Sequence, residues 1–314
     1  MSAFEENPLP PSDPAAKLPE QSLTEQNANS DGSLVSISPD PIALPAEQSN
    51  SNLPVYPPDL QITWGWAHLV VFGLFAFASL FIVQFSLAFY FLPHGQKLTQ
   101  PQLEKYLISK PEFAIGSMVI WYALIFFFLF VTLSLLRGLP FWKSLGWRRI
   151  QPEPFPLPKT PIAYFFLGIA LSMVVALVTA GLKPPENSPI EDLFKNRQSA
   201  LLFVAMAVLL APLVEETLFR GYLYPIFART FGIAPGVVLT GVLFGMMHGA
   251  QLAWTWALVA TLTAVGIVFT LVRSRTGSVL ASFLMHLGYN SLISVAALWS
   301  THGFAKHSSC YWPQ

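Results

Sequence analysis

The sequence contains little cysteine and little charge. Cys310 is the only cysteine, which excludes an internal disulfide, a thiolate metal cluster and a Cys-His catalytic dyad in the core. Only 11% of the residues are charged, whereas 53% are hydrophobic. This composition is typical of a protein embedded in lipid. The net charge is zero, and we expect no nucleic-acid partner.

Several short motifs are absent as well. The chain has neither a P-loop nor Gly-x-Gly-x-x-Gly, so we expect no nucleotide partner and no transport driven by ATP. It also lacks a His-Glu-x-x-His helix, which excludes a zincin-type metal site. Cys310 is fifth from the last residue, so the chain does not carry a prenylation box of its own.

Residues 1–60 differ in composition from the rest of the chain. They carry nine acidic side chains against Lys17 alone, and they are rich in Pro, Ser, Asn and Gln. Their apolar residues are too scattered to form a periodic face, which predicts a disordered acidic tail. The stretch lacks the positive start and short apolar core of a signal peptide. We expect a solvated tail with no specific partner, the alternative being a regulatory or partner-binding tail.

Long windows without charge predict the membrane spans. These windows are 61–96, 113–136, 160–182, 198–214, 230–272 and 276–305. Most are long enough to cross a bilayer once, at about 20 residues a span. The window 230–272 is long enough for two passes, divided at residues 248–251. The predicted fold is an all-α, polytopic transmembrane helix bundle of about seven spans, or about eight if a short or interfacial segment is added.

Lysine and arginine in the short loops predict the orientation. The residues on one side are Arg137, Lys143, Arg148, Arg149, Lys159, Arg229, Arg273 and Arg275, and those on the other are Lys97, Lys105, Lys110, Lys183, Lys195, Arg197 and Lys306. The first side is slightly denser, which places the amino terminus in the cytoplasm. Residues 141–149 combine aromatic and basic side chains and predict an interfacial anchor, with a specific lipid-binding site as the sharper alternative.

Two adjacent glutamates and an arginine follow directly on the apolar run 200–214. Charge at membrane depth costs at least about 2.5 kcal/mol per residue, so these side chains need a cavity, partners or a function. At about 100° per residue, Glu216 and Arg220 share one helix face and can neutralise each other, while Glu215 points away. Glu215 is therefore a candidate general base or metal ligand. The alternative is a purely structural ion-pair cluster.

Two later apolar segments contain histidine. His248 ends the segment Phe244-Gly-Met-Met-His248, and His286 begins the segment His286-Leu-Gly-Tyr-Asn290. The spacing of four residues puts Phe244 beside His248 and Asn290 beside His286. At about 1.5 Å rise per residue, Glu215 and both histidines fall in the middle of a ~30 Å hydrocarbon layer, so they can meet. A lone histidine is more often a hydrogen-bonded core residue, but these three side chains are also those of a two-imidazole, one-carboxylate metal site or a carboxylate-activated water.

Together these segments resemble the three-part signature of the CPBP family, which comprises type II CaaX prenyl endopeptidases and bacteriocin-immunity (Abi) proteins. The order, the spacing and the apolar context match over about residues 200–299. The resemblance implies an all-helical intramembrane endopeptidase with a polar cavity open to the cytoplasm. It makes residues 196–305 the catalytic core, after N-terminal helices and a basic interfacial loop in residues 61–195 and before a short tail in residues 306–314. Glu216 and Arg220 would be the supporting pair.

The resemblance also implies a role for each catalytic residue. Glu215 would activate the attacking water, and His248 would help to orient it. His286 and Asn290 would polarise the scissile carbonyl and stabilise its oxyanion. We favour a metal-independent glutamate mechanism, so no cofactor is assigned. The alternative is a zinc ion bound by Glu215, His248 and His286, which would lower the pKa of its bound water toward about 7.

The expected partners are the lipid bilayer and a membrane-associated protein or peptide substrate, either a prenylated CaaX-type protein or a bacteriocin-like peptide. We predict a substrate cavity lined in part by Phe244 and Tyr289. The expected location is a bacterial plasma membrane, with a photosynthetic membrane as a specific alternative. Two other functions stay open: a catalytically silent scaffold or immunity protein, and a proton-coupled transporter, which should show an inverted repeat that we do not find.

Overall fold

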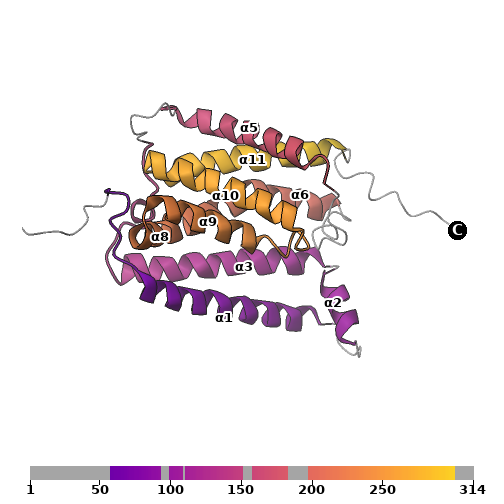
Figure 1. The fold of residues 1–314 in the computed structure, drawn as a ribbon. Coiled ribbons are helices and arrows are strands. Elements are labelled where there is room, and N and C mark those ends of the chain that lie inside the picture. Colours follow the sequence, from indigo (N-terminus) through magenta and orange to yellow (C-terminus); the bar gives the residue numbers. More distant parts are fainter. Residues whose placement is uncertain (1–56, 93–98, 109, 151–157, 183–196, 301–314) are drawn as a thin grey trace, which may run out of the picture. The chain divides into compact units, whose positions relative to one another are not determined.

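The computed structural model describes residues 57–92, 99–108, 110–150, 158–182 and 197–300 (Figure 1). The predicted disordered tail lies outside the described residues up to residue 56, as does the predicted short tail of residues 306–314. The structure therefore tests the predictions for the helical part of the chain.

Helices make up all the regular structure of the described residues. Six segments are long and apolar enough to cross a membrane: α1 (Trp66–Phe91), α3 (Pro111–Leu129) with its π-helical continuation η1 (Phe130–Leu135), α5 (Pro161–Thr179), the composite helix Arg197–Phe231, α10 (Trp256–Thr276) and α11 (Val279–Ser300). A seventh helix, α9 (Ile233–Met247), is apolar but shorter. Two further short helices are α2 (Gln100–Ile108) and α4 (Phe141–Ser144). The all-α transmembrane fold is confirmed, and the predicted count of about seven fits six long spans and α9.

The fourth span is longer than the sequence predicted. The charge-free window ends at residue 214, but the helix continues through both glutamates to Phe231. It consists of α6 (Arg197–Ala205), η3 (Met206–Leu210), α7 (Ala211–Glu216), η4 (Thr217–Leu223) and α8 (Tyr224–Phe231), of which η3 and η4 are π-helical. The predicted boundary was wrong because the charges pair with each other inside the bundle and so do not end the span.

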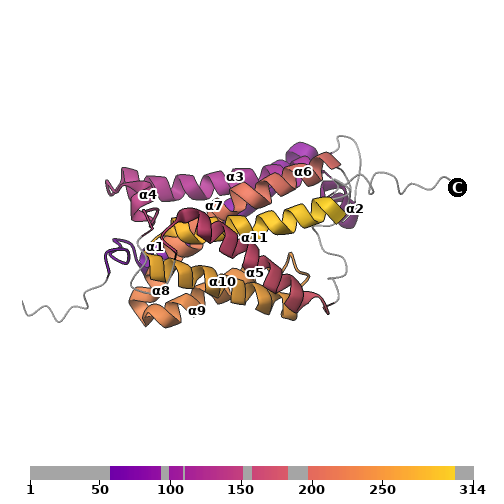
Figure 2. The same ribbon diagram turned by 90° about the horizontal axis from the view of Figure 1, so that it is seen from above.

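The window 230–272 divides where the sequence predicted. α9 ends at Met247, residues 248–255 form turns, and α10 begins at Trp256. The turn lets α10 run back along α9, and the two helices lie side by side in both views (Figures 1 and 2). His248 is therefore the residue that follows α9 and begins the turn.

α5 packs closely against α11 through two glycines. A Cβ atom on Gly168 would clash with the carbonyl oxygen of Met285, and a Cβ atom on Gly288 would clash with that of Phe165. Small residues at such positions let membrane helices approach until their backbones touch, which maximises dispersion contacts where no hydrophobic driving force exists. This contact holds the part of α11 that carries His286.

Basic residues gather at one end of the bundle. This end contains the start of α1, the end of α8, the start of α9, the end of α10 and the start of α11 (Figure 1). The eight basic residues that we assigned to one side of the membrane all lie in or beside these segments or the link from η1 to α5. The structure confirms that they share an end, which we call the basic end. Which face of the membrane it meets stays a prediction.

Residues 57–64 form a non-helical strap across the basic end. Four arginines hold it, two from the link between η1 and α5 and one each from α8 and α10. Arg137 donates to the Thr63 carbonyl (2.8 Å), Arg148 to the Pro58 carbonyl (3.2 Å), Arg229 to the Ile62 carbonyl (2.6 Å) and Arg273 to Asp59 Oδ2 (2.8 Å). Leu60 and Trp64 of the strap are buried. Four of the eight basic side chains that we assigned to this side of the membrane therefore bind this segment of the protein.

The predicted interfacial anchor, residues 141–149, is also partly internal. Leu145 is fully buried, and its carbonyl oxygen packs so closely on Gly221 of η4 that a Cβ atom there would clash with it. The indole N–H of Trp147 donates to Thr217 Oγ1 at 3.1 Å. Trp142 and Lys143 are exposed, as an anchor requires. The segment thus supports the helix that carries Glu216 and Arg220 in addition to facing the interface.

Candidate functional site

Glu216 and Arg220 form the buried ion pair that their spacing predicted. Arg220 Nη1 donates to Glu216 Oε1 at 2.9 Å, and neither side chain is exposed. The guanidinium also donates to the Gly266 carbonyl (2.8 Å) and to Thr270 Oγ1 (3.1 Å) on α10, and it lies 4.6 Å from the centre of the Phe244 ring. A buried pair with this many partners is costly to break, because removing one partner leaves an uncompensated charge.

Glu216 also holds His286. The two residues lie on α7 and α11, and the Nδ1 atom of His286 is 3.0 Å from Glu216 Oε1. Because a carboxylate can only accept, Nδ1 carries the proton and Nε2 of the neutral ring carries a lone pair. Nε2 lies 3.9 Å from Glu215 Oε2. The ion pair thus orients one imidazole toward the second glutamate.

His248 is oriented in a similar way by a backbone group. Its Nδ1 atom donates to the carbonyl oxygen of Phe244, one turn earlier on α9, at 2.8 Å. Its ring packs 4.6 Å from the Phe244 ring. Nε2 is therefore the unprotonated nitrogen of the neutral ring, and it lies 3.8 Å from Glu215 Oε2. Two imidazoles from different helices present a lone pair to one carboxylate oxygen.

Glu215, His248, His286 and Asn290 all line one cavity of about 390 Å³. Glu215 points away from the Glu216–Arg220 pair, as predicted, and its side chain is 16% exposed. Most of the remaining lining is apolar or aromatic and includes Phe244, as well as Tyr289, which was also predicted to lie there. The structure brings all four predicted catalytic residues together and places the supporting pair behind them.

Pro212 of α7 leaves a backbone carbonyl free to bind Asn290. The N–H of Ala211 donates to the Met206 carbonyl in the π-helical pattern, and Pro212, next in the chain, has no N–H to offer Ala207. The carbonyl of Ala207 is thereby left for another donor, and Asn290 Nδ2 of α11 donates to it at 2.7 Å. One N–H of the amide is used in this bond, and one remains for a ligand.

The cavity extends toward the end of the bundle opposite the basic end. Its lining includes Phe203 of α6, Thr179 near the end of α5, and Gln251 and Leu252 in the turn after α9. All these segments lie at the end of the bundle opposite the start of α1 (Figures 1 and 2). The basic end, which we expected at the cytoplasmic face, and the end toward which the cavity extends are thus opposite ends of the bundle, so the expected orientation and the expected opening of the cavity to the cytoplasm both stay predictions.

The donor atoms around Glu215 suit zinc in type. Both Nε2 atoms are unprotonated in the neutral rings, and each ring is held through its other nitrogen, as in zinc sites. Two ligands of a tetrahedral zinc ion lie about 3.3 Å apart, whereas the two nitrogens are 3.8 and 3.9 Å from Glu215 Oε2. Within the described ranges, no group of three His, Cys, Asp or Glu side chains has the geometry of a metal site. To bind zinc, the two histidine nitrogens would thus have to move about 0.5 Å closer to Glu215 Oε2.

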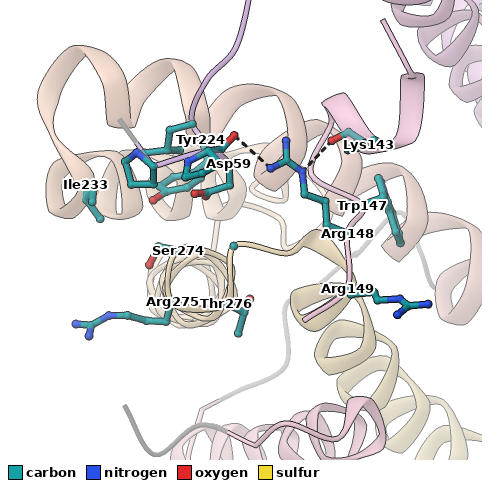
Figure 3. A pocket seen from close by; sticks show the side chains of 14 residues that line it. Asp59, Lys143, Trp147, Arg148, Arg149, Tyr224, Ile233, Ser274, Arg275 and Thr276 are labelled. Carbon is teal, nitrogen blue, oxygen red and sulfur yellow. Dashed lines mark hydrogen bonds between the residues drawn. The ribbon is translucent and has the colours of Figure 1, made fainter. Parts of the chain in front are cut away.

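A second cavity, of about 1090 Å³, lies at the basic end and contains none of the predicted site residues. Its wall includes Arg148, Arg149, Arg275 and Asp59 (Figure 3). Arg148 is engaged by backbone carbonyls at Pro58 and Lys143, and the side chains of Arg149 and Arg275 point away from each other. The cationic groups do not converge on one point, so the specific lipid-binding site remains an untested prediction.

Sequence reasoning missed part of the cavity wall. Met118 and Tyr122 of α3 and Val175 and Thr179 of α5 line the same cavity as Glu215. They belong to windows that looked uniformly apolar, and only their spacing of four residues could have indicated a shared face. Their contact with the site depends on how the helices pack.

Comparison with known families agrees with this geometry. Residues 197–292 match the family of Rce1-like type II CAAX prenyl endopeptidases. The segment contains every residue of the predicted signature, so the resemblance inferred from the three motifs is confirmed. No curated protein and no solved structure matches the chain. The apolar helices and the family together identify an integral membrane protein.

Proposed function

We propose that this chain, which carries an Rce1-like segment at residues 197–292, is an intramembrane endopeptidase that uses Glu215 to activate water. The observation that carries the proposal is the placement of Glu215 Oε2 within 3.9 Å of two imidazole nitrogens in a mostly apolar cavity. Among the described residues Glu215 forms no ion pair with a lysine or arginine, so its carboxylate is the group that we propose accepts the proton of the water.

The residues around the cavity can divide the reaction between them. A water molecule between Glu215 and His248 Nε2 would bond to the scissile carbonyl carbon while Glu215 accepts its proton. The carbonyl electron pair would move to oxygen, where the second amide N–H of Asn290 can donate. On collapse of the tetrahedral species the C–N bond breaks, and Glu215 returns the proton to the leaving amine.

His286 also faces Glu215, with its Nε2 atom 3.9 Å from Glu215 Oε2. With Nδ1 bound to Glu216, its Nε2 can accept a hydrogen bond from water, or donate one if the ring is protonated. If a zinc ion is bound, Glu215, His248 and His286 would hold it, and the ion would make its bound water more acidic. The assignments of all four catalytic residues and of the Glu216–Arg220 pair are part of this proposal.

The substrate we propose is a membrane-associated peptide or protein, either prenylated at a CaaX-type end or bacteriocin-like. The mostly apolar wall supports a substrate that enters from lipid, and the small group of polar atoms at Glu215 and Asn290 supports one that presents a peptide bond. A bacterial plasma membrane is the proposed location.

The proposal is tested with the purified full chain in liposomes and a library of membrane-anchored peptide reporters. Wild type is compared with Glu215→Ala and His248→Ala, and Glu112→Ala serves as the control because Glu112 is exposed at the start of α3. We expect cleavage by wild type and Glu112→Ala only. A chelator arm with zinc added back separates the two mechanisms. If all four folded proteins leave every reporter intact, or all cleave alike, the peptidase assignment is wrong.

A further inference from the structure

Tyr122 lies in the wall of the candidate site although α3 is outside the family match. The rotation of α3 is fixed by its neighbour Trp121, whose indole N–H donates to the Ala76 carbonyl of α1 at 2.9 Å. At about 100° per residue, Met118 and Tyr122 lie about 60° and 100° around the helix from Trp121, on one flank of α3. Both line the cavity that contains Glu215.

The hydroxyl of Tyr122 is available to a ligand. Among the described residues no hydrogen bond engages it, and its oxygen is not one of the fully buried side-chain atoms that lack a partner. The oxygen is therefore not fully covered, and the residue that carries it belongs to the cavity wall. Tyr122 and Glu215 line the same cavity. A neutral phenol is a hydrogen-bond donor.

The motif residues leave few donors for an oxyanion. Nδ1–H of His248 is committed to the Phe244 carbonyl and Nδ1–H of His286 to Glu216, so both neutral rings offer only an accepting Nε2. One amide N–H of Asn290 is committed to the Ala207 carbonyl. Glu215 can only accept. One N–H of Asn290 is thus the single neutral donor left among these four residues, whereas acyl-transfer sites stabilise the developing charge with preorganised donors that usually act in combination.

We propose that the Tyr122 hydroxyl is the second donor to the carbonyl oxygen of the scissile peptide bond, acting together with the remaining N–H of Asn290. The inference rests on the proposed endopeptidase function. Tyr122 keeps its proton throughout. While the water oxygen bonds to the carbonyl carbon and Glu215 takes the proton of the water, the Tyr122 hydroxyl donates a hydrogen bond to the carbonyl oxygen. When the electron pair returns from that oxygen and the C–N bond breaks, this hydrogen bond weakens. Tyr122 would be a catalytic residue contributed by the N-terminal half of the chain.

The test compares Tyr122→Phe with Tyr164→Phe on a reporter that wild type cleaves. Tyr164 is a matched control, because its hydroxyl donates to the Pro158 carbonyl at 2.8 Å and the residue lines neither cavity. We expect Tyr122→Phe to lower kcat about 10²- to 10³-fold with little change in KM. A phosphinate analogue of the reporter, which mimics the tetrahedral species, should bind Tyr122→Phe more weakly by a similar factor. Tyr164→Phe should keep the wild-type kcat and unfold at a lower temperature.

Three results would overturn the proposal. Tyr122→Phe that cleaves at the wild-type rate contradicts it, as does an equal loss of kcat in Tyr164→Phe. A lower unfolding temperature of Tyr122→Phe also contradicts it, because this would show that the hydroxyl bonds within the protein. If wild type itself cleaves no reporter, the proposed function fails and takes this inference with it, so the two failures are distinguishable.

Discussion

His286 and Glu216 fix each other across two helices, with Nδ1 of His286 donating to Glu216 Oε1 at 3.0 Å. The same oxygen accepts from Arg220 at 2.9 Å. Glu216 Oε1 therefore forms an ion pair within its own helix and also sets the tautomer of His286 on α11. The Glu216–Arg220 pair thus joins residues within its own helix and also orients His286 on α11.

Replacing Glu216 by Gln should destabilise the protein strongly. The change leaves the Arg220 guanidinium buried without a counter-charge, and breaking a buried pair in this way costs about 3–5 kcal/mol of the free energy of unfolding. Chemical unfolding in detergent measures the effect. Glu112→Gln, which changes an exposed glutamate on α3, should stay within about 0.5 kcal/mol of wild type. Equal stability of the two variants would mean that the pair does not support the bundle.

Gly168→Ala should weaken the contact between α5 and α11. Its added Cβ would meet the Met285 carbonyl oxygen, so the helices must move apart, at a cost of about 1–3 kcal/mol in the free energy of unfolding. Gly73→Ala in α1 is the matched control, since a Cβ there meets no atom within 4 Å. The control should equal or exceed the stability of wild type by up to about 1 kcal/mol, because alanine favours a helix. The idea of close backbone packing fails if both variants behave alike.

The side of the membrane that the cavity faces can be measured directly. In a Cys310→Ser background, Lys143→Cys labels the basic end and Gln100→Cys the cavity end, since both positions are exposed. From the positive-inside rule we expect an impermeant maleimide to label Gln100→Cys in intact cells and Lys143→Cys only after permeabilisation. The reverse pattern would show that the cavity opens to the cytoplasm, as the family resemblance implied, and that the loop charges gave the wrong orientation.

The local spacing of polar residues was enough to predict the core of the site. The interval of four residues predicted that Glu216 and Arg220 pair, and the isolated direction of Glu215 predicted that it faces a different environment. The sequence 248–251 correctly predicted the turn between α9 and α10 because its glycine, alanine and glutamine interrupt two apolar runs. These features depend on neighbours within one helix.

Features that depend on contacts between distant segments were not predicted. The end of the fourth span was placed at residue 214 because a charge-free window cannot show that Glu216 and Arg220 neutralise each other within the bundle. The strap of residues 57–64 was assigned to a disordered tail up to residue 60, although Leu60 and Trp64 are buried and four arginines bind its backbone and Asp59. Tyr122 was missed for the same reason, since its place in the cavity follows from the packing of α3 on α1.

The measurement that tests the central claim most directly is the single-turnover rate of reporter cleavage by Glu215→Gln. The substitution keeps the shape of the side chain and removes its ability to take a proton, and general-base catalysis contributes about 10²- to 10⁴-fold. We predict a loss of this size with an unchanged unfolding temperature, because Glu215 has no hydrogen bond to lose among the described residues. A folded Glu215→Gln that cleaves at the wild-type rate would show that another group activates the water.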